Sequence, residues 1–314
     1  MIKLICVLGP TASGKTKYAV KLAKEIGAEI ISADSRQVYR GMDIGTGKDL
    51  ADYTIDGIQI PYHLIDIVDA GEKYNIFRYQ RDFAAAYKDI TSRGKKVILC
   101  GGSGLYIEAV TKGYELPDVP QNPKLREELE QRSTEDLIDL LKSMVKTHNS
   151  TDYDTRKRLI RALEIAFYKQ EHPEDEGIYT LDESFPRFLP EEVQYIGTDV
   201  SREERVRRID ARLDARLKEG MLQEVQTLLD KGIPAEDLIY YGLEYKFVTL
   251  HLIGELTFDQ MREQLAIAIH QFAKRQMTWF RGMERRGYTI NWINADQTIE
   301  QKVQQALEII QKNS

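Results

Sequence analysis

The chain has 314 residues, of which 42% are hydrophobic and 30% charged, a composition that excludes a disordered or fibrous protein. No apolar run approaches the ~20 residues that a membrane-spanning helix needs, so we expect no membrane partner. The formal net charge of −6 argues against indiscriminate binding to polyanions, although local clusters of basic residues can still attract them.

The cysteine content indicates the compartment. Cys6 and Cys100 are the only cysteines, and both lie in apolar, strand-like runs. This pattern is typical of small buried hydrophobic residues under reducing conditions rather than of a disulfide or a metal site. We therefore expect a cytoplasmic protein, and we expect a monomer.

The first third of the chain alternates short apolar runs with amphipathic ones. Strands are predicted over Ile2–Leu8, Glu29–Ser32 and Lys96–Cys100, and helices over Lys15–Ile26 and Phe77–Arg93. Continuously apolar strands separated by helices indicate a parallel sheet covered on both faces. Because a glycine-rich loop joins the first strand to the first helix, we predict a P-loop NTPase-like α/β fold.

The pattern changes after Gly113, where prolines become frequent and no strand is predicted until Val193–Thr198. We predict a helical insertion domain over residues 115–190, while residues 1–114 and 191–314 form the core. Its predicted helices are Lys124–Gln131, Ser133–Lys146 and Thr155–Lys169. Beyond the insertion we predict helices over Arg202–Lys231, Tyr240–Leu252, Thr257–Met283 and Ile299–Lys312, and a strand over Tyr288–Ile293.

The loop after the first strand matches the phosphate-binding pattern G-x-x-x-x-G-K-[ST] at every fixed position. Its glycines let backbone N–H groups surround phosphate oxygens at the start of a helix. The lysine adds a positive charge, and the threonine hydroxyl is placed to ligate Mg²⁺. The predicted diphosphate-binding residues are Gly9, Pro10, Thr11, Ala12, Ser13, Gly14, Lys15 and Thr16, with Thr16 as the metal ligand.

Two further strands end in polar residues. Asp34 follows the second strand, and Ser103 follows the strand that ends at Cys100. Ligands in open α/β sheets bind beyond the carboxyl ends of the strands, so both side chains are expected to face the phosphate loop. Asp34 could bind Mg²⁺, act as a base or close a turn, and Ser103 could donate a hydrogen bond or cap a helix. ATP hydrolases with this loop commonly have a later apolar strand that ends in aspartate. This sequence shows no such pattern, which argues against ATP hydrolysis.

Basic residues cluster in the second half of the chain despite its acidic balance. Each cluster alone is explained by a solvated helix face, and three clusters in an acidic protein leave open both solvated faces and a surface for polyanions. The clusters contain Arg156, Lys157, Arg158 and Arg161; Arg202, Arg205, Arg207, Arg208, Arg212 and Arg216; and Lys274, Arg275, Arg281, Arg285 and Arg286.

Six motifs in order resemble those of the tRNA dimethylallyltransferase family across nearly the whole chain. They are GPTASGKT at 9–16, SADSRQVYRGMDIGT at 32–46, GGSGLY at 101–106, RIDARL at 208–213, EGMLQEV at 219–225 and AKRQMTWFR at 273–281. The resemblance implies transfer of a dimethylallyl group from dimethylallyl diphosphate to N6 of the adenosine next to the anticodon in tRNAs that read codons beginning with U.

The resemblance also implies the roles of individual residues. Asp34 matches the catalytic aspartate, and Ser103 stands where the family usually has a threonine that donates to the leaving diphosphate. Arg212 matches a diphosphate-binding arginine, and Mg²⁺ is the implied cofactor. Residues implied or expected to lie near the tRNA anticodon stem-loop are Asp34, Ser35, Arg36, Gln37, Ser103, Arg126, Arg156, Arg158, Lys274, Arg275 and Gln276.

Three other functions fit parts of the sequence. A prenyltransferase acting on free adenine nucleotides would share the chemistry but would not need the helical insertion. A P-loop kinase for a small metabolite would use ATP and would not need the basic clusters. A non-catalytic RNA-binding module would leave the combination of Lys15, Asp34 and Ser103 without a purpose.

Overall fold

The computed structural model describes residues 1–114, 119–145, 155–174, 181 and 185–312. The chain forms two compact units. The larger one combines Met1–Gly113 with Phe185–Ser314, and the smaller one is Tyr114–Ser184. Among the described residues, no helix is both long enough and apolar enough to cross a membrane.

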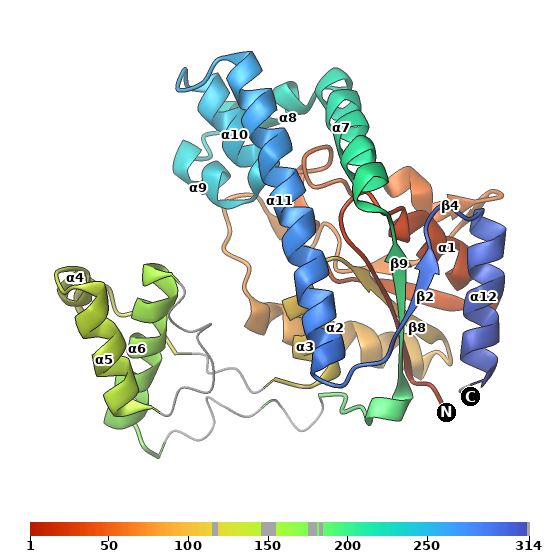
Figure 1. The fold of residues 1–314 in the computed structure, drawn as a ribbon, viewed down its shortest axis with the longest axis horizontal. Coiled ribbons are helices and arrows are strands. Elements are labelled where there is room, and N and C mark those ends of the chain that lie inside the picture. The colour runs from red at the N-terminus through yellow and green to blue at the C-terminus, as the bar shows by residue number, and fades with distance from the viewer. Residues whose placement is uncertain (115–118, 146–154, 175–180, 182–184, 313–314) are drawn as a thin grey trace. The chain divides into compact units, whose positions relative to one another are not determined.

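A six-stranded sheet forms the centre of the larger unit (Figure 1). Its strand order is β10-β9-β1-β8-β2-β6, and every neighbouring pair is parallel. The strands are β1 (Leu4–Leu8), β2 (Ala28–Ser32), β6 (Tyr62–His63), β8 (Lys96–Gly101), β9 (Val193–Asp199) and β10 (Ile290–Asn294). The parallel sheet predicted from continuously apolar strands is confirmed, and β6 is an edge strand that the sequence did not reveal.

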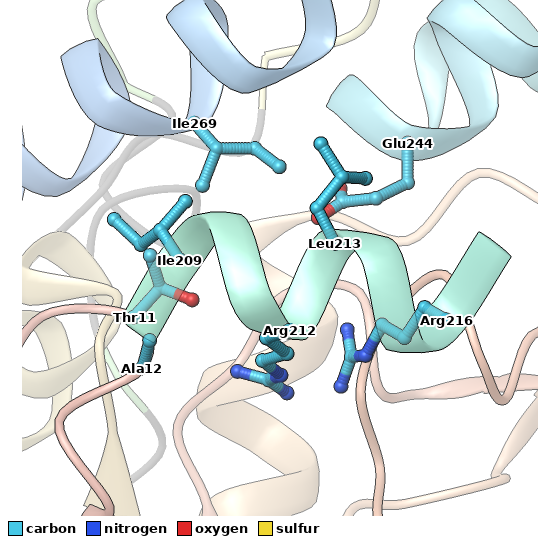
Figure 2. Close-up of a pocket in the computed structure, with 8 residues that line it drawn as sticks. All are labelled: Thr11, Ala12, Ile209, Arg212, Leu213, Arg216, Glu244 and Ile269. Atoms are coloured by element: carbon cyan, nitrogen blue, oxygen red, sulfur yellow. The ribbon is translucent and has the colours of Figure 1, made fainter. Parts of the chain in front are cut away.

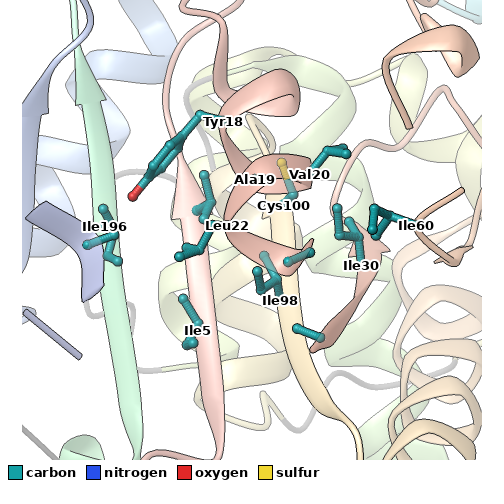
Figure 3. Packing of buried hydrophobic residues seen from close by; sticks show 14 of the residues in the cluster. Ile5, Tyr18, Ala19, Val20, Leu22, Ile30, Ile60, Ile98, Cys100 and Ile196 are labelled. Atoms are coloured by element: carbon teal, nitrogen blue, oxygen red, sulfur yellow. The ribbon is translucent and has the colours of Figure 1, made fainter. Parts of the chain in front are cut away.

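Alternate residues of each strand pack against different helices. Ile5, Ile98 and Ile196 lie in one buried cluster with side chains of α1 (Lys15–Ile26) and α12 (Ile299–Lys312) (Figure 3). The other face is covered by α2 (Ile76–Ser92), α3 (Gly104–Thr111) and α11 (Phe258–Arg285) (Figure 1). Burial on both faces explains why these strands are apolar throughout instead of alternating.

Four helices gather beyond the end of β9 together with the first half of α11 (Figure 1). They are α7 (Arg202–Glu219), α8 (Met221–Asp230), α9 (Ala235–Tyr240) and α10 (Leu243–Leu252). The prediction of one helix over Arg202–Lys231 is wrong, because Gly220 has a φ of 108° that ends α7. The predicted start of a helix at Tyr240 is also wrong, since Gly242, with a φ of 143°, separates α9 from α10.

The segment between β2 and α2 is mostly irregular and is organised around one buried cation. It contains the short strands β3 (Tyr39–Arg40), β4 (Thr54–Ile55), β5 (Ile58–Gln59) and β7 (Val68–Asp69), and the 3₁₀ helix η1 (Leu50–Tyr53). The Lys48 side chain is fully buried, and its ammonium donates to the Tyr39 carbonyl and to Asp43 Oδ1, both at 2.6 Å, and to Asp66. A buried charge requires such partners, so Lys48 fixes the path of this segment.

The smaller unit has its own core of helices α4 (Pro123–Glu130), α5 (Thr134–Met144) and α6 (Arg156–Glu171). The side chains of Asn122, Ser133 and Thr155 each accept a hydrogen bond from a first-turn N–H of the helix that follows. These caps explain where the helices begin. Of the predicted insertion 115–190, the structure describes residues 119–145, 155–174, 181 and 185–190, the last of which opens the 3₁₀ helix η4 (Pro190–Glu192).

Candidate functional site

The loop between β1 and α1 has the backbone of an anion-binding turn. Ala12 and Gly14 both have positive φ values, 60° and 77°, as in anion-binding turns, and the Ser13 amide between them donates to the Pro10 carbonyl at 3.4 Å. The Ser13 hydroxyl lies 2.8 Å from Thr198 Oγ1 of β9, which anchors the loop to the neighbouring strand. The loop is therefore fixed at the start of α1, where the helix dipole favours negative charge.

Lys15 and Thr16 begin α1 and are both half-buried. The Lys15 ammonium donates to the Pro10 carbonyl at 3.3 Å. Burial lowers the pKa of Lys15, and the negative charge of Asp34 opposes that shift. The Thr16 hydroxyl has no hydrogen bond within the described part of the chain, so it is available to a ligand. No group of three or more acidic, histidine or cysteine residues in that part could hold a metal ion by itself.

Asp34 directly follows the buried end of β2 and is half-buried. Its Oδ1 accepts a hydrogen bond from the Arg36 amide at 2.9 Å, so the turn-closing role considered for this residue is observed. Its Oδ2 has no hydrogen bond from the described residues. One carboxylate oxygen thus orients the side chain, while the other can accept a proton.

Ser103 occupies the N-cap position of α3 but does not cap it. Its side chain accepts no hydrogen bond from the described residues of the helix, unlike the caps of α2, α4, α5, α6, α7 and α11. The interpretation of Ser103 as an ordinary helix cap is therefore wrong. Its amide donates to the Ala33 carbonyl at 3.3 Å, which brings the Ser103 turn beside the residue that precedes Asp34.

Small residues make this close approach of the two turns feasible. A Cβ on Gly101 would lie 2.2 Å from the Ala33 carbonyl oxygen, and one on Gly104 would lie 2.1 Å from the Trp279 ring. A Cβ on Gly102 would lie 2.4 Å from Nε2 of Gln276. Gly101 ends β8, and Gly102 and Gly104 follow it; a side chain at any of the three would force a different neighbour to shift.

Gln276 of α11 joins the two loops. Its side-chain oxygen accepts from the Thr11 amide at 2.8 Å, and its nitrogen donates to the Gly102 carbonyl at 2.9 Å. The side chain is 7% exposed. Both ends of the amide are therefore used inside the protein, and the expected contact of Gln276 with tRNA stays a prediction.

A small pocket opens between the phosphate loop and α7 (Figure 2). Arg212 and Arg216 extend from the same side of α7, and Glu244 of α10 also lines the pocket. Burial, together with the charge of Arg212, lowers the pKa of Arg216. Burial raises the pKa of Glu244, although both arginines oppose that shift. The pocket therefore combines two cations with the loop that carries Thr11 and Ala12.

The residues after Asp34 are held by internal contacts. The Arg36 guanidinium lies 5.5 Å from the centre of the Tyr240 ring. Gln37 accepts from the Ser32 hydroxyl at 2.9 Å and donates to the Gly47 carbonyl at 3.2 Å. Ser35 is half-buried in the same turn. These residues lie beside Asp34, and their predicted contact with tRNA is not tested by the structure.

The remaining predicted tRNA residues lie on two separate units. Lys274 and Arg275 are exposed on α11, with the Arg275 guanidinium 6.0 Å from the Phe272 ring centre. In the smaller unit, Arg126 donates to both oxygens of buried Glu164, at 2.9 and 2.8 Å. Arg156 reaches the carbonyls that end α4, including that of Glu130 at 2.8 Å, and Arg158 is exposed on α6. Arg126 and Arg156 thus have structural contacts, and a role in tRNA binding remains a prediction for all of them.

Comparison with known proteins identifies the family. The model of the IPP transferase family matches residues 37–283. A tRNA dimethylallyltransferase of Parabacteroides distasonis is 56% identical over 308 residues, covering 98% of this chain and 97% of the relative. The chain belongs to the tRNA dimethylallyltransferase family. A second relative so named, from Porphyromonas gingivalis, is 58% identical over 292 residues, covering 93% of this chain and 94% of the relative.

Solved structures of the family share the fold. The tRNA isopentenylpyrophosphate transferase of Bacillus halodurans has a TM-score of 0.69 at 31% identity, covering 100% of this chain and 97% of that one. A eukaryotic dimethylallyltransferase described as acting on tRNA has a TM-score of 0.74 at 23% identity, covering 99% of this chain and 80% of that one, and this likeness concerns the fold alone. The predicted fold class and the predicted family are therefore confirmed.

Three parts of the site did not follow from the sequence. The sequence contained Arg216 only as one of six arginines, with nothing to distinguish it from its neighbours. The spacing of four residues from Arg212 was the available signal, because it places both side chains on one face of a helix. Gln276 bridges two distant loops, and Asp49, which precedes η1, forms ion pairs with Arg212 at 3.1 Å and with Arg216 at 3.4 Å; no local sequence pattern indicates either set of contacts.

Proposed function

We propose that this protein transfers the dimethylallyl group of dimethylallyl diphosphate to N6 of the adenosine next to the anticodon in tRNAs that read codons beginning with U. The products are N6-dimethylallyladenosine in tRNA and diphosphate. The observation that carries the proposal is that the phosphate loop, Asp34 and Ser103 lie together at the carboxyl ends of β1, β2 and β8. Membership of the tRNA dimethylallyltransferase family supports it.

The diphosphate is proposed to lie in the loop Gly9–Thr16, with Lys15 and Arg212 neutralising its charge. A diphosphate leaves only when the negative charge that develops on it is stabilised. Mg²⁺ held by the Thr16 hydroxyl and by diphosphate oxygens would add to that neutralisation. The free hydroxyl of Thr16 fits such an ion, because Mg²⁺ commonly takes one or two protein ligands, with substrate phosphates and water completing its shell.

Asp34 and Ser103 are proposed to act on the reacting atoms. The N6 lone pair of adenosine forms a bond to C1 of the dimethylallyl group while the C1–O bond breaks and its electron pair leaves with the diphosphate. Asp34 accepts the N6 proton through Oδ2, the oxygen that makes no hydrogen bond within the described chain. The Ser103 hydroxyl donates to the bridging oxygen of the leaving diphosphate, and its lack of a capping bond supports this role.

The acceptor is proposed to be a base that is turned out of its stack, since a stacked base cannot reach the end of β2. The segment 115–190 is proposed as the tRNA-contacting insertion, and residues 1–114 with 191–314 as the catalytic core. The tRNA-binding residues proposed in addition to Asp34 and Ser103 are Ser35, Arg36, Gln37, Arg126, Arg156, Arg158, Lys274, Arg275 and Gln276. We propose that the protein acts in the cytoplasm as a monomer.

The test is incubation with radiolabelled dimethylallyl diphosphate and Mg²⁺, with unmodified tRNA or AMP as the acceptor. We expect the label in tRNA, at the adenosine next to the anticodon, without any requirement for ATP. Label in AMP but not in tRNA would instead make the protein a nucleotide prenyltransferase. If neither acceptor is labelled and ATP serves as a phosphate donor, the proposed reaction is wrong.

A further inference from the structure

The arginine pair of the pocket is bound to a carboxylate from another part of the chain. Asp49 Oδ2 lies 3.1 Å from Nη2 of Arg212 and 3.4 Å from Nη2 of Arg216. Arg216 is 7% exposed, so its guanidinium group needs an anionic partner, whereas the neighbouring Arg212 side chain is 32% exposed. Asp49 supplies the one carboxylate that forms ion pairs with both among the described residues.

The contacts of Asp49 are weaker than a permanent ion pair would make. Charge-assisted N–H···O bonds are usually about 2.7–2.9 Å long. The three contacts between Asp49 and the arginines are 3.1, 3.4 and 3.5 Å, and 49% of the Asp49 side chain is exposed. The hydrogen bonds from the two guanidinium groups to Asp49 are thus long. Because the Asp49 side chain is half exposed, its carboxylate can move away from the arginines into solvent.

The backbone of Asp49 is left-handed. Asp49 has a φ of 46° and a ψ of 49°, a region in which aspartate and asparagine are more frequent than other residues with a Cβ. It precedes the 3₁₀ helix η1, yet its side chain does not cap that helix. The carboxylate is therefore directed at the arginines instead of stabilising its own turn.

The loop before Asp49 is fixed by a second carboxylate. Glu224 of α8 accepts hydrogen bonds from the amides of Asp43, Ile44 and Gly45, at 2.8, 2.7 and 3.0 Å. A Cβ on Gly47 would lie 2.1 Å from Nη2 of Arg212 and 2.2 Å from Nη2 of Arg216, so the loop backbone runs against both guanidinium groups. This anchoring keeps the Asp49 carboxylate close to both arginines.

Carboxylates and phosphates bind arginine in the same manner, through two oxygens facing the guanidinium N–H groups. The arginines line the same pocket as Thr11 and Ala12 of the phosphate loop. We propose that Asp49 occupies, in the substrate-free protein, the position on Arg212 and Arg216 that a phosphate group of the substrate takes, and that it withdraws when diphosphate binds. Arg216 is then a second diphosphate-binding arginine. This inference rests on the proposed function for the identity of the anion.

The competition weakens diphosphate binding, because the intrinsic affinity is multiplied by the fraction of substrate-free molecules in which Asp49 is already displaced. Two substitutions remove it without disturbing the backbone. Asp49→Asn is isosteric, and asparagine tolerates the left-handed region. Asp49→Gly tolerates that conformation equally well and removes the side chain entirely. Asp52→Asn is the matched control, because Asp52 lies on η1 close by and forms its ion pair with Lys17 at 3.5 Å, so its charge acts on Arg212 without occupying the position on the arginines.

The measurement is calorimetric titration of the full chain and its variants with magnesium diphosphate. We expect both Asp49 variants to bind about two- to tenfold more tightly than the unchanged chain, the range for two partly exposed ion pairs, and the Asp52 variant to gain clearly less than either of them. The KM for dimethylallyl diphosphate should fall by the same factor, and the KM for tRNA should stay constant.

Equal or weaker diphosphate binding by the Asp49 variants overturns the proposal, as does an equal gain in the Asp52 control. The titration needs no prenyl transfer. Failure to label tRNA would therefore reject the proposed function, while the comparison of the Asp49 variants would still decide the competition.

Discussion

At the scale of single residues, the two oxygens of the Asp34 carboxylate have different surroundings. One closes the turn with the Arg36 amide, and the other has no partner within the described chain. A substitution can therefore separate the two roles. Asparagine keeps an oxygen that accepts from the amide but provides no base.

We predict that Asp34→Asn lowers kcat by roughly 10²–10⁴-fold, the usual contribution of a general base. The affinity for tRNA and the melting temperature should remain close to those of the unchanged chain, because the turn persists. Single-turnover rates and a tRNA binding titration measure the two effects. A variant with normal turnover would remove Asp34 from the mechanism.

Ser103 allows a similar separation, because its hydroxyl does not cap α3. We predict that Ser103→Ala lowers kcat by about 10²–10³-fold, as the loss of one donor to a developing anion does. Ser103→Thr keeps the hydroxyl and should retain most of the activity. A helix cap would instead contribute about 1 kcal/mol to stability. Urea denaturation of the alanine variant should show much less than this, and a loss of that size without a loss of kcat would contradict the assignment.

At the scale of elements, α11 connects the two ligand-facing loops through Gln276. A hydrophobic residue in its place would leave the Thr11 amide and the Gly102 carbonyl without partners. The phosphate loop would then lose one of its fixed points, whereas the exposed surface of α11 would be unchanged.

We predict that Gln276→Leu raises the KM for dimethylallyl diphosphate about tenfold, because a lost hydrogen bond to a buried group costs about 1–3 kcal/mol. Lys274→Ala, an exposed position on the same helix, is the matched control and should raise the KM for tRNA instead. Steady-state kinetics with each substrate varied in turn distinguish the two. An effect of Gln276→Leu on the KM for tRNA alone would leave only the proposed contact with tRNA and would contradict the role of Gln276 in fixing the phosphate loop.

At the scale of the whole molecule, the sheet edge near β6 is joined to α2 by one buried carboxylate. Glu29 of β2 accepts from Nη2 of Arg93 and pairs with Nε2 of His63, both at 2.8 Å. Hydrogen bonds from Arg93, opposed by burial and assisted by His63, hold the pKa of Glu29 down to about 2. The ordinary value is 4.5, so folding favours the ionised form.

Because the folded pKa is lower than the unfolded one, the stabilisation is fully present above pH 4.5 and is lost as the pH falls toward 2. We predict that the free energy of unfolding decreases by a few kcal/mol across this window. Glu29→Gln should unfold more easily at neutral pH and should show a shallower decrease toward acid. Urea denaturation between pH 2 and 7 measures both slopes, and parallel slopes would exclude Glu29 as a main cause.

The sequence indicated the class of fold and the ends of the strands that carry chemistry, because apolar runs and the phosphate loop are local patterns. It did not indicate that Gly220 ends α7, since glycine inside a helical pattern does not by itself show a break. Local sequence patterns also did not predict the contacts between segments that are distant in the chain. Ser103 could be placed at a strand end, but only the structure separates it from an ordinary cap.

The glycines at and after the end of β8 also limit which single substitutions this chain can accept. Gly101 faces a backbone oxygen, Gly102 faces an amide side chain and Gly104 faces an indole ring. Each of the three positions can take a larger residue only if its own neighbour shifts, so a change that makes room at one position leaves the other two closed. Ser103, which lies among these glycines and already carries a Cβ, is the position of this loop outside that constraint.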